Sequence, residues 1–101
     1  MRNDLRSAAF LQRLRQLHPD AELSVIHEHP WHSLTFSGAQ LCIAANLCDE
    51  HHADTATRIA KLLPEYDFDL KRQLVADIAV TDVISNATQS CLTINALLLD
   101  S

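Results

Sequence analysis

The chain has 101 residues and a formal net charge of −5 at pH 7; 48% of its residues are hydrophobic and 21% are charged. This composition is typical of one globular domain, here residues 1–101, and the charged fraction is too low for an obviously disordered protein. The negative charge argues against nucleic-acid binding, because Lys and Arg supply most of the affinity for a phosphate backbone. No apolar run reaches the roughly 20 residues that cross a bilayer, so we expect no membrane partner.

The N-terminal sequence and the cysteines both favour a cytoplasmic protein. The opening MRNDLRSAAF has no continuous apolar stretch behind Arg2, so a secretory signal is not expected. Cys42, Cys48 and Cys91 show neither a CxxC motif nor paired spacing, which argues against a disulfide framework and a thiolate zinc site. We interpret them as small, half-buried free thiols.

A first helix is predicted over residues 4–18. Asn3 is a suitable N-cap and Asp4 suits the positive end of the helix dipole. Pro19 ends the helix, because the residue before a proline is pushed out of the helical region. One face carries the apolar stripe expected to contact the core, which consists of Leu5, Ala8, Leu11, Leu14 and Leu17 with Phe10 beside it.

Residues 22–48 alternate between apolar and polar side chains, as in ELSVIHE, HSLTFS and QLCIAANLC. This alternation predicts three antiparallel strands joined by tight turns. A first turn centred on His29 and Pro30 would place His27 directly opposite His32. Because proline cannot adopt the positive φ of a type I′ turn, this turn needs a wider loop or a cis bond before Pro30.

A second turn is predicted at Gly38 and Ala39. The glycine suits the first central position of a type II′ hairpin turn. Leu34 would then lie opposite Ile43, and the apolar sides of all three predicted strands would share one face. The two registers, each chosen from turn chemistry alone, therefore agree on one meander.

The segment HEHPWH, residues 27–32, suggests a metal site. In the predicted register the imidazoles of His27 and His32 are about 5 Å apart at Cβ, and His29 joins them if the strand continues. His27, His29 and His32 could then hold a divalent transition metal ion. No thiolate or aspartate stands at a ligand-like spacing, so an exposed or hydrogen-bonded histidine cluster without metal is the interpretation that we favour.

The second half of the chain predicts a helix and two strands. The helix covers residues 50–63 with Asp49 as its N-cap, and strands cover residues 73–84 and 91–99 on either side of the polar turn SNATQS. The predicted order is α-β-β-β-α-β-β. It corresponds to an α+β, two-layer domain with a five-stranded antiparallel sheet and two helices packed on one face. The inward sides of the last two strands would be Leu74, Ala76, Ile78 and Val80, and Leu92, Ile94, Ala96 and Leu98.

The opposite side of the last two strands is more apolar than a solvated sheet face requires. We therefore predict a homodimer interface or a partner interface there. Trp31 is added as the best candidate for an exposed anchor, because tryptophan is enriched at binding hot spots; a tryptophan that covers the edge of the core is the alternative that we favour. The predicted interaction surface consists of Trp31, Val75, Ala79, Val83, Leu97 and Leu99.

Enzymatic chemistry finds little support in the residues. A single glycine cannot build a phosphate-binding loop or a dinucleotide fingerprint. The predicted register turns Cys42 to the outer side and the histidines of the first two strands inward, which separates a nucleophile from its base. We therefore predict neither catalytic nor cofactor-binding residues; a small hydrolase or lyase with an unrecognised site is the third alternative.

The element order α-β-β-β-α-β-β, the small size and the acidic charge are similar to the general layout of dimeric type III secretion chaperones. That resemblance of topology implies a dimer that binds effector proteins, and no residue is carried over from it. We predict a small, non-enzymatic protein-binding domain that acts as an adaptor, chaperone or inhibitor of a larger protein and forms a homodimer. The alternative is a metal-binding protein that uses the histidine cluster.

Overall fold

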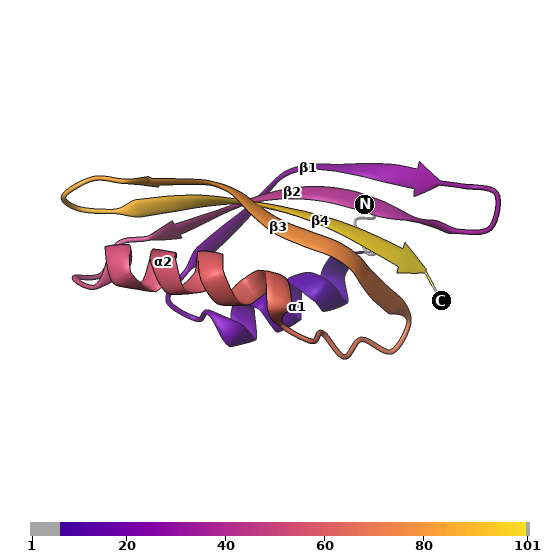
Figure 1. The fold of residues 1–101 in the computed structure, drawn as a ribbon, viewed down its shortest axis with the longest axis horizontal. Helices are drawn as coiled ribbons and strands as arrows, with labels where there is room; N and C mark the ends of the chain where they lie inside the picture. The colour runs from indigo at the N-terminus through magenta and orange to yellow at the C-terminus, as the bar shows by residue number, and fades with distance from the viewer. Residues whose placement is uncertain (1–6, 101) are drawn as a thin grey trace.

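The structure is a computed structural model that describes residues 7–100. Within these residues it contains two α-helices and a four-stranded antiparallel sheet in the spatial order β1-β2-β4-β3. The elements are α1 (Ala8–Leu17), β1 (Glu22–His32), β2 (Ser37–Leu47), α2 (His52–Leu62), the short 3₁₀ helix η2 (Leu63–Glu65), β3 (Gln73–Ser85) and β4 (Ser90–Asp100). Both helices lie against the same face of the sheet (Figure 1).

The predicted α+β fold with an antiparallel sheet and two helices is confirmed, but the prediction of five strands is wrong. Neither described helix is long and apolar enough to cross a membrane. The order α-β-β-α-β-β within residues 7–100 also has one strand fewer than the layout of the secretion chaperones.

The missing strand is explained by the position of the first turn. HEHPWH does not form a hairpin tip; it is the second half of β1. The chain turns instead at Ser33–Phe36, where the Ser33 N–H donates to the Phe36 carbonyl (2.8 Å) and the Phe36 N–H donates to Ser33 Oγ (3.1 Å). Pro30 is tolerated because β1 is an edge strand, in which a residue without an N–H can face away from the neighbouring strand.

Gly38 and Ala39 lie within β2 and not in a turn, so the predicted type II′ turn is wrong. Glycine is required at this position for a different reason. β2 and β4 approach so closely that a Cβ on Gly38 would collide with the backbone carbonyl oxygen of Leu98. The close approach, and not a positive φ, accounts for the single glycine.

Two β-bulges change the alternation of β3. The register with β4 shifts between Val75 and Asp77 and again between Val80 and Asp82. Each shift inserts a residue, so the side chains that follow point to the opposite face from a regular strand. The inward set predicted for residues 73–84 is therefore partly wrong, and Leu74 is 59% exposed.

The core lies between the sheet and the helices. β2 and β4 contribute the alternate residues that the sequence predicts, Leu41, Ile43, Ala45, Leu47, Leu92, Ile94, Ala96 and Leu98, and all of them are buried. The Phe10 ring of α1 packs against Phe68 with 5.1 Å between ring centroids. Leu14 of α1 and Ile59 of α2 complete the helix side of the same cluster.

The helix ends differ from the predicted caps. Asn3 and Asp4, with the start of the predicted first helix, lie outside the described residues. Ser7 precedes α1, and its hydroxyl donates to Glu28 Oε1 of β1 (2.8 Å) and not to the backbone of the helix. The N-cap of α2 is His51 and not Asp49.

Candidate functional site: the outer face of the sheet

The face of the sheet that points away from the helices, here called the outer face, is not covered by any described element (Figure 1). The strand registers align its residues in rows that run across the strands. At the end of the sheet where β1 finishes, Trp31 lies opposite Gly38, Gly38 opposite Leu99, and Leu99 opposite Leu74. We call Trp31, Gly38, Leu99 and Leu74 the apolar row.

The next row carries Leu97 at its centre. Leu97 of β4 lies between Gln40 of β2 and Asp77 of β3, and Gln40 lies opposite His29 of β1. Leu97 and Leu99 are half-buried even though no helix covers them. Leu97 and the apolar row form a continuous apolar surface on β4 and its neighbours. The imidazole of His29 borders this surface on the β1 side, and the carboxylate of Asp77 borders it on the β3 side.

Beyond these two rows the outer face carries a polar network, and exposed Ile84 lies further along β3 opposite Cys91. Asn95 Nδ2 donates to Thr81 Oγ1 (2.8 Å), and Thr81 Oγ1 donates to the Thr93 carbonyl (3.5 Å). These groups satisfy one another within the protein and leave few donors or acceptors for a ligand. The candidate site is therefore the apolar end of the outer face, and the Thr81–Asn95 network is its border.

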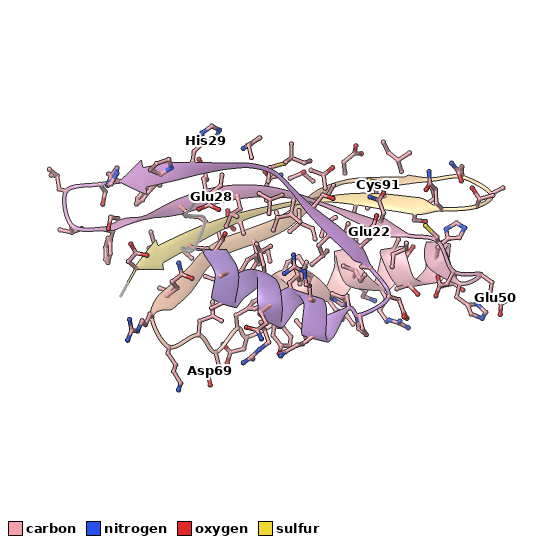
Figure 2. The ribbon with its side chains drawn as sticks, turned by 180° about the vertical axis from the view of Figure 1, so that it is seen from behind. Glu22, Glu28, His29, Glu50, Asp69 and Cys91 are labelled. Carbon is pink, nitrogen blue, oxygen red and sulfur yellow. The ribbon has the colours of Figure 1, made fainter. Side chains whose placement is uncertain are left out.

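A bulge in β1 decides how HEHPWH is arranged. The register with β2 shifts between Val25 and His27, so His27, His29 and Trp31 point to the outer face. Glu28 points to the helix side, where Ser7 reaches it. Figure 2 shows His29 directed away from the helices and Glu28 directed toward them.

The predicted pairing of His27 with His32 is wrong. His27 lies opposite Cys42 and His32 lies opposite Ser37, so His32 is on the helix side of the sheet. The His27 and His29 rings are neighbours with 4.7 Å between their centroids. Within residues 7–100 no group of three or more His, Cys, Asp or Glu side chains is placed to hold a metal ion. The proposed ligands are thus divided between the two faces.

The same bulges sort the predicted interaction residues. Four of the predicted interaction residues lie on the outer face, as the sequence predicts: Trp31, Ala79, Leu97 and Leu99. Val75 and Val83 lie on the helix side, opposite Leu98 and Leu92, because the inserted residues reverse the alternation around them.

Leu74, Cys42 and Ala44 belong to the outer face and sequence reasoning did not include them in the interaction surface. Cys42 could have been found, because its outward position follows from simple alternation in β2. Leu74 could not, because a regular strand through residues 73–84 places it inward. His27 and Cys42, which the predicted register separates, are cross-strand neighbours.

Charge is distributed unevenly between the sheet and the rest of the molecule. No Lys or Arg occurs in any strand of the described sheet. The outer face carries the carboxylates of Glu22, Asp77 and Asp82. The described basic residues lie in the helices and in the loop before β3; they are Arg13, Arg15, Arg58, Lys61, Lys71 and Arg72.

A second polar cluster lies on the helix side and was not predicted. Ser90 Oγ is 2.7 Å from His52 Nδ1 and 2.7 Å from Ser85 Oγ, and His52 Nε2 is 3.5 Å from the Ala87 carbonyl. A histidine–serine pair suggests a nucleophile, but Ser90 is 0% exposed and out of reach of a substrate. The cluster connects the start of α2 to the β3–β4 turn.

His18 is a half-buried titratable residue at the C-terminal end of α1. Burial lowers the pKa of His18, and the positive charge of Arg58 lowers it further. His18 follows α1 on the helix side of the molecule. Its ionisation therefore concerns the stability of the fold and not the outer face.

Similarity to known proteins gives no independent indication of the function of this face. Comparison with protein-family models, with curated proteins and with solved structures finds no significant match for the chain.

Proposed function

We propose that the chain is a small, non-enzymatic protein-binding domain, acting as an adaptor, chaperone or inhibitor, that receives a partner protein on the outer face of its sheet. The apolar row is the observation that supports this proposal most directly. It places a tryptophan and two leucines on a solvent-facing surface across the whole width of the described sheet. At about 4.8 Å between neighbouring strands, the row is about 14 Å long.

Binding at this row would bury side chains that contribute strongly to association. A tryptophan buries about 150–250 Å² when it is covered, and such residues are enriched at hot spots near the centre of interfaces. Leu99 and Leu74 continue the row on β4 and β3 beyond Gly38, and the Thr81–Asn95 network supplies a polar border. An apolar centre with a polar border is the usual anatomy of a protein interface.

A partner protein suits this face better than a second copy of the same chain. Two outer faces brought together would oppose their Asp77 and Asp82 carboxylates without any Lys or Arg from either sheet. Like charges across an interface disfavour association. The homodimer predicted from the sequence stays a prediction, and light scattering at high micromolar concentration tests it.

The proposal is tested with two leucines of similar exposure. Leu74 of the apolar row is 59% exposed, and Leu62 of α2, on the helix side, is 54% exposed. In an affinity pull-down from a lysate, Leu74→Ser should fail to retain the proteins that the native chain retains. Leu62→Ser should retain them as the native chain does. Equal retention by both variants, with both folded by circular dichroism, would refute binding at the outer face.

The alternative function, metal binding, draws on the neighbouring His27 and His29 rings. They offer two imidazole ligands on one strand face, fewer than the three protein ligands of most zinc sites. The geometry thus favours protein binding over metal binding.

A further inference from the structure

We infer that the partner segment that docks on the outer face is cationic and amphipathic, with apolar side chains for the apolar row and Lys or Arg side chains for the carboxylates beside it. This inference rests on the proposed function and names the chemistry of the partner. It follows from the charges of the outer face and from their distance to the apolar row.

The carboxylates of the outer face have no ion-pair partner within the described part of the chain. Asp77, Asp82 and Glu22 are exposed, and none of them forms an ion pair within residues 7–100. The described strands contain no Lys or Arg, so no strand of the sheet supplies a cation that neutralises them. A cation from a partner would therefore meet these carboxylates without displacing an existing partner.

The carboxylates stand at useful distances from the apolar row. Asp77 is one row away from Leu74 and Leu99, beside Leu97, and Asp82 is two rows further along β3. Successive rows on one face are about 6.7 Å apart, so the two carboxylates are about 13 Å apart along the strand. A segment that places an apolar side chain over Leu99 brings its next residues to Asp77.

Within residues 7–100 all basic residues lie outside the sheet, and Lys71 and Arg72 are in the loop before β3. Arg13 and Arg15 belong to α1, and Arg58 and Lys61 belong to α2. An acidic partner would thus find its complement on the helices, and a cationic partner finds it on the sheet. Complementary charge of this kind increases the association rate and selects among partners.

Trp31 provides a direct readout of docking. It is the only tryptophan of the chain and belongs to the apolar row. Three short peptides without tryptophan serve as probes: one with alternating Leu and Lys, one with Ser in place of Lys, and one with Glu in place of Lys. Each is titrated into the full chain at pH 7.5 while Trp31 emission is followed.

The Leu–Lys peptide is expected to shift Trp31 emission and to bind more tightly than the Ser peptide, and the Glu peptide is expected to bind most weakly. Asp77→Asn and Asp82→Asn should each weaken the Leu–Lys peptide by about 1.5- to 5-fold, the range for exposed ion pairs. Raising the salt concentration should also weaken the binding of the Leu–Lys peptide. Asp20→Asn with Glu65→Gln, which removes two exposed carboxylates outside the sheet, should leave the affinity unchanged.

Two different failures can be distinguished. If the Ser or Glu peptide binds as tightly as the Leu–Lys peptide, or if Asp77→Asn with Asp82→Asn has no more effect than the control pair, the cationic partner is refuted while the outer face remains a binding surface. If no peptide changes Trp31 emission, the inference is refuted. Equal retention of lysate proteins by Leu74→Ser and Leu62→Ser would in addition refute the proposed function.

Discussion

Gly38→Ala should strongly destabilise the protein, although it adds a single methyl group. The new Cβ would overlap the Leu98 carbonyl oxygen and would lie 2.9 Å from the Leu98 carbonyl carbon and 3.0 Å from Leu99 Cα. All three atoms belong to the backbone of β4, so no side-chain rotation can relieve the collision. β2 and β4 must separate locally, at the centre of the sheet.

The expected cost combines overpacking with weakened pairing. Extra methyl groups in a packed interior cost about 1–3 kcal/mol, and a lost ladder hydrogen bond adds about 1 kcal/mol. The free energy of unfolding should therefore fall by about 2–4 kcal/mol, out of a total of about 5–15 kcal/mol for a typical domain. The melting temperature should fall by about 10–25 °C.

Urea denaturation followed by far-ultraviolet circular dichroism measures this loss without relying on Trp31, which lies opposite Gly38. Ala44→Ser is the matched control, because it also adds one heavy atom to the outer face of β2. The control should change stability by no more than about 0.5 kcal/mol. If Gly38→Ala is as stable as the control, the close approach of β2 to β4 is not the reason for the glycine.

Three further predictions concern the histidines. Because the pKa of His18 is lowered in the fold, the unfolded chain binds more protons below about pH 6.5, and the stability should fall as the pH falls from there. The melting temperature of His18→Gln should fall less steeply with decreasing pH. A parallel decrease in the native protein and the variant would contradict this prediction. His52→Ala should cost about 1–3 kcal/mol in urea denaturation, because it removes the partners of buried polar groups; an unchanged midpoint would show that the cluster does not hold α2. Isothermal titration with Zn²⁺ should give weak binding that is lost in His27→Ala with His29→Ala and kept in His32→Ala, which lies on the other face; equal loss in both would restore the three-histidine site.

The regular part of the sheet could be predicted from the sequence. In β2 and β4 apolar residues alternate without interruption, and Leu41, Ile43, Leu92 and Ile94 are buried as the alternation predicts. The polar turn before β4 was also predictable, because Asn86 accepts hydrogen bonds from the Thr88 and Gln89 N–H groups, which is the usual role of asparagine in a turn.

The irregular part could not be predicted, and it determines the candidate site. A bulge cannot be recognised from the residue types, but the bulges in β1 and β3 turn the side chains of His27, Val75 and Val83 to the opposite face of the sheet. Turn propensities also gave a wrong prediction, because proline and glycine are typical turn residues. Here Pro30 lies in an edge strand, and Gly38 lies where two strands approach closely. Leu34 and Phe36 alternate like a strand but lie exposed at the actual turn.

Pro30 and the bulges have a consequence for how the molecule behaves among its own copies. β1 and β3 are the two outermost strands of the described sheet, and an unprotected outermost strand is a template on which further strands polymerise. Proline in β1 removes a donor from that template, and the twisted, carboxylate-bearing β3 offers no regular line of hydrogen-bonding groups. These features make both edges poorer templates for sideways growth, which lowers the hazard of fibre formation for a sheet with an exposed apolar surface.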